Sequence, residues 1–184
     1  FCDPDYAEKM QFYQAALICI DGVKSFQNRY AKLAEDMAES CTDARRKQEL
    51  LMIASNCRRV PYEPASTYFE AVQSFWFVIL IDYCGQNGSS ISGGRIDQIL
   101  RPYYEKEIKA GTLTREEARE ILECLWIKHS DIIKAGTYSS VRNNGGFSTA
   151  NNIVLGGLDE NGEDAVCDFT FVCLDAEESV FNSE

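Results

Sequence analysis

The residues best suited to chemistry lie in one polar segment, residues 85–98, which reads Gly-Gln-Asn-Gly-Ser-Ser-Ile-Ser-Gly-Gly-Arg-Ile-Asp-Gln. It contains three serine hydroxyls, four glycines, amide side chains and an arginine close to an aspartate. The segment follows Phe75–Ile81, one of the most apolar stretches of the chain. Polar side chains on a loop beside apolar support are typical of a buried pocket for a small ligand. We therefore expect the binding site to include this segment.

Each polar side chain of this segment also has a structural interpretation. Ser89 and Ser90 either line a pocket or cap turns, as serine commonly does beside glycine. Ser92 is expected to be structural. Arg95 and Asp97 are expected to form an internal ion pair that braces the loop and takes no part in the reaction.

Two asparagines and the single histidine have open roles. Asn87 and Asn151 either satisfy backbone groups or face the cavity, and the residue types favour neither. His129 follows an apolar stretch near the end of a predicted helix. It is interpreted as a structural or surface residue, without a role in catalysis.

The elements that must position this segment are mostly helices. Apolar residues recur at helical spacing through most of the chain, and Ser, Thr and Asp residues stand at the expected helix starts. A short apolar run bounded by glycines at 152–156 predicts a buried strand. So many helices with so few strands indicate a part of a larger α/β protein. The predicted helices run from Tyr6 to about Glu39, from Thr42 or Asp43 to Cys57, from Ser66 or Thr67 to Ile81, from Ile96 to Lys109 with a kink or interruption at Pro102, from Thr114 to Lys134, and from an Asp168 cap to Ser179.

Composition excludes several classes of partner. The formal net charge of −11 comes without a basic stripe, which argues against nucleic acid or an anionic membrane as a partner. No apolar run is long enough to span a membrane, and no signal segment is present at Phe1, so a cytoplasmic location is expected.

The eight cysteines predict neither a disulfide framework nor a metal site. They form no Cys-x-x-Cys motif and no Cys/His pair at metal-ligand spacing. Cys19, Cys57, Cys124 and Cys173 lie among apolar neighbours and are expected to pack as reduced thiols in the core.

Several motifs, in order along nearly the whole chain, resemble the glycyl radical enzymes related to pyruvate formate-lyase. The resemblance is closer to the dehydratase and C–X lyase branch than to pyruvate formate-lyase itself. The motifs are Arg58-Arg-Val-Pro61 with Glu63-Pro-Ala, Glu70-Ala-Val-Gln-Ser-Phe-Trp-Phe77, Ser90-Ile-Ser-Gly-Gly-Arg-Ile-Asp-Gln98, Pro102-Tyr-Tyr, Leu113-Thr-Arg-Glu-Glu-Ala118, Glu123-Cys-Leu-Trp-Ile-Lys128 and Asn152-Ile-Val-Leu-Gly-Gly157.

The resemblance implies that residues 1–184 are the mostly helical portion of a ten-stranded α/β barrel, truncated at both ends, from an enzyme that is usually a homodimer. It also implies a backbone glycyl radical, installed by an activating enzyme that uses S-adenosylmethionine and an iron–sulfur cluster. The chain itself is expected to bind no cofactor. In this family the radical passes to a cysteine, whose thiyl takes a hydrogen atom from a small substrate. The substrate radical then loses water, an amine, sulfite or carboxylate, according to the subfamily.

Two family motifs are missing from these residues. Neither the glycyl loop, which resembles Arg-Val-Ser/Ala-Gly-Tyr, nor the Gly-Cys-Val-Glu/Ser type loop of the radical cysteine is present. In the family, both loops lie C-terminal to the region that this chain covers. We therefore expect no catalytic residue in this chain and no activity from it alone.

The resemblance assigns substrate binding to Ser89, Ser90 and Phe147. Diol-dehydratase-like members have Asn-Gly-His-Ser where this chain has Asn87-Gly88-Ser89-Ser90, so Ser90 keeps the substrate-binding hydroxyl and Ser89 replaces the histidine. Phe147 stands where a tyrosine is common. Because a serine hydroxyl is not a proton donor of histidine's kind, glycerol or propanediol dehydration by the usual protonation pattern is in doubt. The less protic pocket suits a larger or more apolar substrate.

The function expected from the sequence is C–X bond cleavage by a glycyl radical dehydratase or lyase. The alternatives within the family are an arylacetate-type decarboxylase and a fumarate-adding C–C synthase. The alternative of a different class is a helical interaction module without catalysis, which would be indicated if the complete gene lacked both radical loops.

Overall fold

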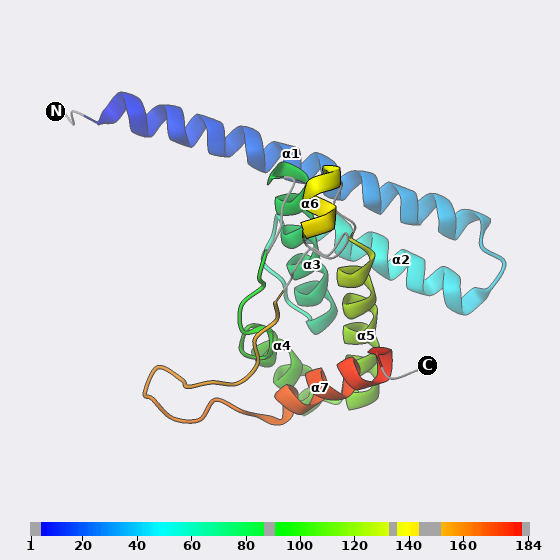
Figure 1. The fold of residues 1–184 in the computed structure, drawn as a ribbon. Helices are drawn as coiled ribbons and strands as arrows, with labels where there is room; N and C mark the ends of the chain where they lie inside the picture. The colour runs from blue at the N-terminus through cyan, green and yellow to red at the C-terminus, as the bar shows by residue number, and fades with distance from the viewer. Residues whose placement is uncertain (1–4, 87–90, 133–135, 144–151, 182–184) are drawn as a thin grey trace. The chain divides into compact units, whose positions relative to one another are not determined.

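The computed structural model describes residues 5–86, 91–132, 136–143 and 152–181, and it divides into two units, Phe1–Ala65 and Ser66–Glu184. The first unit is a helical hairpin of α1 (Tyr6–Ser40) and α2 (Ala44–Arg59) (Figure 1). Asp43 begins α2, because its carboxylate accepts hydrogen bonds from the backbone N–H groups of Arg45 and Arg46 at 2.8 and 3.0 Å. Of the two predicted caps, Asp43 is therefore the one that the structure uses.

Small side chains allow the two helices of the hairpin to approach closely. Ala31, Ala34 and Ala38 of α1 are buried, as are Leu50 and Ala54 of α2. In contrast, many large apolar side chains on the N-terminal half of α1 are exposed in this chain; they include Tyr6, Phe12, Tyr13, Leu17 and Ile18. The hairpin core is therefore built from a narrow stripe of small residues on the second half of α1.

The second unit contains α3 (Tyr68–Gln86), α4 (Ile96–Ala110), α5 (Arg115–Asp131), the short α6 (Tyr138–Asn143) and α7 (Asp168–Phe181). The predicted signals at the starts of α3 and α5 and at the end of α4 are confirmed. Glu70 accepts hydrogen bonds from the backbone N–H groups of Ser66 and Thr67 at the start of α3. Thr114 and Glu117 form the predicted capping box of α5. Gly111 ends α4 with a φ of 70°.

Four helix predictions need correction. The helix predicted to end at Ile81 continues to Gln86 as α3. Pro102 does not interrupt α4, because buried residues on both sides of it hold the helix together although its nitrogen cannot donate the helical hydrogen bond. The polar stretch after Gly136 contains the unpredicted helix α6. Asp168 is the first residue of α7 and not its cap; its carboxylate accepts from the Tyr104 hydroxyl and pairs with Arg115.

The predicted strand at 152–156 is wrong for the described part of this chain. Val154 makes one isolated parallel bridge to Arg95, and Leu158 makes one antiparallel bridge to Asp164. A strand needs continuous pairing with a neighbour, and here only the backbone next to Arg95 pairs with it: Val154 N–H donates to the Gly94 carbonyl at 3.2 Å. The described residues are thus mostly helical, and the barrel is not seen in them.

The core of the second unit is aromatic. Phe169 of α7 packs against Tyr104 of α4 and Tyr68 of α3, with ring centroids 4.6 and 5.7 Å apart. The Tyr68 hydroxyl donates to the carbonyl of Ala118 in α5 at 3.1 Å. Figure 1 shows α7 lying against α4 and α5. This cluster joins four helices and holds the start of α7 in place.

The cysteine prediction is half correct. Cys57 and Cys173 are buried, whereas Cys19 and Cys124 are exposed. Burial raises the pKa of Cys57 to about 11 and raises the pKa of Cys173 further. Both buried thiols are therefore protonated at neutral pH and pack as small apolar groups. No helix of the described residues has the length and apolar character needed to cross a membrane.

His129 is structural, as predicted, and it is buried in an aromatic cluster rather than at the surface. Its ring centroid lies 5.6 Å from that of Trp76 and 6.2 Å from those of Phe75 and Trp126. Burial lowers the pKa of His129 below its ordinary value of 6.5, because the apolar surroundings disfavour the imidazolium.

We predict that His129 makes the chain less stable in mild acid. A depressed pKa means that the unfolded chain binds the proton more tightly, so the stability is fully present above pH 6.5 and falls as the pH drops below it, by at most about 1.4 kcal/mol per pH unit. Urea denaturation between pH 7.5 and 5.5 measures this slope. The matched control is His129→Phe, which keeps a ring and removes the only histidine. An equal slope in wild type and variant would contradict the assignment.

Candidate functional site

Of the predicted site segment 85–98, Gly85 and Gln86 are the last residues of α3, residues 87–90 lie outside the described part of the structure, and residues 91–98 are described. Gly93 lies directly against the apolar stretch that precedes the loop. A Cβ added to Gly93 would lie 2.2 Å from the Phe75 ring of α3. Gly94 has a φ of 73°, in the left-handed region that favours glycine. The paired glycines therefore let the backbone pass close to α3 and turn into α4.

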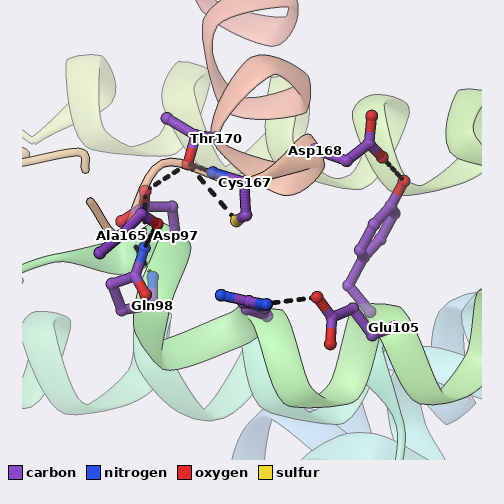
Figure 2. A network of polar contacts seen from close by, with 9 residues as sticks. Asp97, Gln98, Glu105, Ala165, Cys167, Asp168 and Thr170 are labelled. Carbon is purple, nitrogen blue, oxygen red and sulfur yellow. Dashed lines mark hydrogen bonds and ion pairs between the residues drawn. The ribbon is translucent and has the colours of Figure 1, made fainter. Parts of the chain in front are cut away.

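Asp97, in the first turn of α4, is the centre of a buried polar cluster. Its side chain has no solvent exposure. Its Oδ2 accepts hydrogen bonds from the Thr170 hydroxyl at 2.6 Å, the Gly156 N–H at 2.8 Å and Gln98 Nε2 at 3.1 Å. Its Oδ1 accepts from the Gln98 N–H at 2.9 Å. Figure 2 shows the Thr170 hydroxyl between Asp97 and Cys167. We call Asp97, Gln98, Gly156 and Thr170 the Asp97 clamp.

Arg95 does not form the predicted ion pair with Asp97. Its Nη1 donates to the carbonyl of Leu158 at 2.5 Å and to that of Gly156 at 3.4 Å. The pair fails because both side chains have closer partners in the same turn: Arg95 takes carbonyls and Asp97 takes an N–H. Both residues instead form hydrogen bonds with residues 156–158.

The turn at 156–158 is shaped for this grip. Gly156 and Gly157 have φ values of 64° and 89°, and a Cβ on Gly156 would lie 2.9 Å from Val166 Cγ2. A side chain at either position would be strained by the backbone alone. The glycine turn therefore places the Gly156 N–H against the Asp97 carboxylate. It also places the carbonyls of Gly156 and Leu158 against the Arg95 guanidinium.

The clamp extends to the start of α7. The Thr170 hydroxyl also accepts from the Cys167 N–H at 3.1 Å, and Gln98 Nε2 donates to the Ala165 carbonyl at 2.8 Å. Outside the clamp, the Tyr104 hydroxyl donates to Asp168 Oδ2 at 2.9 Å. Burial, and then this bond, raise the pKa of Tyr104 to about 12. The end of the loop, the glycine turn and α7 are thus one hydrogen-bonded assembly.

The clamp is suited to positioning and not to proton transfer or nucleophilic attack. The Asp97 carboxylate is buried, and both of its oxygens already accept from protein donors. The nearby buried thiol of Cys173 has a pKa raised by burial, then by Asp97, so it is not a nucleophile at neutral pH. The described residues hold no group of three or more His, Cys, Asp or Glu side chains placed to bind a metal ion.

The structure describes some of the predicted site residues and not others. Ser92 is exposed, and Arg95 and Asp97 belong to the assembly above. The other predicted residues, Asn87, Ser89, Ser90, Phe147 and Asn151, lie outside the described residues. Sequence reasoning missed Thr170 and Gly156, which lie 73 and 59 positions from Asp97. The only available signal was the glycine pair at 156–157, which was interpreted as the boundary of a strand.

Comparison with known proteins shows which family the chain is similar to. It matches the family model described as pyruvate formate lyase-like over residues 2–184. It is 38% identical over 176 residues to (2S)-3-sulfopropanediol dehydratase of Klebsiella oxytoca, covering 94% of this chain and 21% of that protein. It is 38% identical over 174 residues to isethionate sulfite-lyase of Desulfovibrio desulfuricans, covering 92% and 21%.

A solved structure gives the same result. The chain superposes with a TM-score of 0.94 and 47% identity on a structure that concerns 1,2-propanediol dehydration in Roseburia inulinivorans, covering 98% of this chain and 22% of that one. The chain spans about a fifth of the length of these relatives. Since the family model matches almost every residue, the chain belongs to the pyruvate formate lyase-like family of glycyl radical enzymes, in the branch of the dehydratases and sulfite-lyases.

Proposed function

We propose that this chain is part of a glycyl radical dehydratase or lyase that cleaves a C–X bond in a small substrate, and that it contributes wall to the substrate cavity. The observation that carries the proposal is the Asp97 clamp, which holds the end of the family's site segment, residues 91–95, against residues 154–158. A loop fastened at several points, two of them the buried hydrogen bonds of Asp97 to Gly156 and Thr170, suits a site that must hold its substrate in one orientation.

The radical chemistry itself would come from residues outside this chain. A glycyl radical, installed by an S-adenosylmethionine and iron–sulfur activating enzyme, supplies a thiyl that removes a hydrogen atom from the substrate. We propose that the complete enzyme is a cytoplasmic homodimer and that 1–184 is a truncated portion of its barrel domain. In this scheme Ser90 donates or accepts a hydrogen bond to the substrate, and Phe147 forms an apolar wall that excludes water.

Ser89 is proposed to restrict which leaving groups the site can assist. A histidine near pH 7 can release a proton by passing from the cationic imidazolium to the neutral imidazole, whereas a serine hydroxyl does not release its proton there. We therefore propose a substrate larger or more apolar than glycerol or propanediol, even though similar proteins include one concerned with propanediol dehydration. The protonation of any hydroxyl leaving group would have to come from elsewhere in the site.

The test uses the complete enzyme, activated without oxygen by its activating enzyme. Electron paramagnetic resonance measures the glycyl radical, and turnover is measured with glycerol, 1,2-propanediol, 3-sulfopropanediol and isethionate, and with larger, more apolar diols. We expect a radical signal, weak turnover of glycerol and 1,2-propanediol, and a gain of about tenfold or more in their turnover in Ser89→His, in line with typical contributions of general acids. Ser90→Ala should lose turnover of every substrate.

Two results would contradict the proposal in different ways. A complete protein that never gains a glycyl radical, or whose gene lacks both radical loops, would exclude the radical mechanism. Rapid dehydration of glycerol by the unaltered enzyme would leave the radical mechanism standing and exclude the role given to Ser89.

A further inference from the structure

The Asp97 clamp joins three stretches of chain that are far apart in sequence: the end of the glycine-rich segment, the turn at 156–158 and the first turn of α7. We propose that Asp97 is a positioning residue of the substrate site, which sets how residues 91–95 lie against residues 154–158 and thereby the fit of the substrate. This inference rests on the proposed function of the site.

The first argument is the strength and number of the bonds. Hydrogen bonds to an ionised, buried carboxylate are stronger than neutral ones, and removing the acceptor leaves buried donors unsatisfied. Here those donors are the Gly156 N–H, the Thr170 hydroxyl and the Gln98 side chain, at 2.6–3.1 Å from Oδ2. A change in the position of the carboxylate must therefore break these bonds or form others in their place.

The second argument is the close packing behind two glycines. A Cβ added to Gly93 would overlap the Phe75 ring of α3, and a Cβ added to Gly156 would lie 2.9 Å from Val166 Cγ2. Each side of the clamp therefore has a close neighbour at one of its glycines. A shift of the carboxylate must move residues 93–95 or the turn as a body, and active sites are sensitive to displacements of about 1 Å.

The third argument is that Asp97 acts through the backbone. Its side chain is fully buried and both oxygens are occupied, so it has no surface with which to touch a substrate. The residues that it holds follow directly in sequence after Ser89 and Ser90, which are proposed to bind the substrate. A positional role therefore predicts a change in substrate fit, and not a change in the chemistry that forms the radical.

The test compares three single variants of the complete, activated enzyme. Asp97→Asn keeps the shape of the side chain but replaces one acceptor oxygen by a donor. Thr170→Val removes the hydroxyl at nearly constant volume. Tyr104→Phe is the matched control, because it removes another hydrogen bond between α4 and α7, the one to Asp168 at 2.9 Å, without touching the clamp.

We expect Asp97→Asn to lower kcat/KM by about tenfold or more, mainly through a higher KM, with the glycyl radical content unchanged. Thr170→Val should show a smaller change in the same direction, and Thr170→Ser should restore KM. Tyr104→Phe should keep the KM of the unaltered enzyme even if its thermal stability falls. An unchanged KM in Asp97→Asn, with kcat falling only as the folded fraction falls, would overturn the proposal.

Hydrogen exchange separates this inference from the proposed function. In Asp97→Asn, amide exchange should become faster in both residues 91–95 and residues 152–158, and it should be unchanged there in Tyr104→Phe. If the unaltered enzyme turns over no substrate, the proposed function fails. The exchange measurement still shows whether Asp97 holds residues 91–95 against residues 152–158. Equal exchange in Asp97→Asn and the unaltered enzyme would show that Asp97 does not hold the two segments together.

Discussion

Replacing Phe169 with alanine is expected to lower the free energy of unfolding of the second unit by about 3–5 kcal/mol. Phe169 is 1% exposed and packs against both Tyr68 and Tyr104. Those two rings belong to α3 and α4, so the cavity left behind would separate α7 from both helices. The loss can be measured by urea denaturation of the 184-residue chain, followed by the fluorescence of its two tryptophans, Trp76 and Trp126.

The matched control lies two residues farther along the same helix. Phe171 is 53% exposed, so Phe171→Ala removes the same atoms from a position that is largely in water. We expect its free energy of unfolding to stay within about 0.5 kcal/mol of the wild type. A loss below about 1 kcal/mol in Phe169→Ala, or equal losses in both variants, would contradict an α7 anchored by this aromatic cluster.

Replacing Gly93 with alanine is expected to destabilise the second unit by about 1–3 kcal/mol, the usual cost of overpacking. The added methyl group would lie 2.2 Å from the Phe75 ring, so either the ring or the loop backbone must move. Chemical denaturation measures the loss. In the complete enzyme, the same displacement should raise KM, because Gly93 lies only four residues before Asp97 in the segment that the clamp holds.

A second substitution identifies the cause. Phe75→Leu shortens the side chain that blocks the new methyl group, so the double variant should recover part of the loss, with a coupling of about 0.5–3 kcal/mol. Gly85→Ala is the control glycine, because nothing lies within 4 Å of its added Cβ and it belongs to α3. It should be neutral or stabilising by up to about 1 kcal/mol. Additive effects of Gly93→Ala and Phe75→Leu would mean that the two residues are not in contact.

Helix starts were predictable because their signals are local. A capping box such as Thr114 with Glu117 needs only two side chains three residues apart, and the structure contains it as predicted. The helix end at Gly111 follows in the same way from a left-handed backbone that favours glycine. Pro102 misled the prediction because its effect on a helix depends on tertiary packing, which can hold the helix together across the missing hydrogen bond.

The glycine-rich segment was recognised as a candidate site from its composition, but its anchoring was not. The expected pair of Arg95 with Asp97 is the simplest pairing of two close, opposite charges. The structure instead satisfies them with the backbone of 156–158 and with Thr170. No spacing rule connects positions about sixty or seventy residues apart, so the choice between these partners depended on which segments the fold brings together.

The amino-acid sequence by itself determined the helical character of this chain, most of its helix starts, its family and the segment where a site is to be sought, because these depend on neighbouring residues and on motifs. Only the tertiary structure decided that Val154 makes one isolated bridge where a strand was expected, that Cys19 and Cys124 are exposed, and that Asp97 is buried beneath Thr170 and Gly156. The physical reason is that pairing and burial are properties of surfaces that meet in space, and the order of residues along the chain does not specify which surfaces meet.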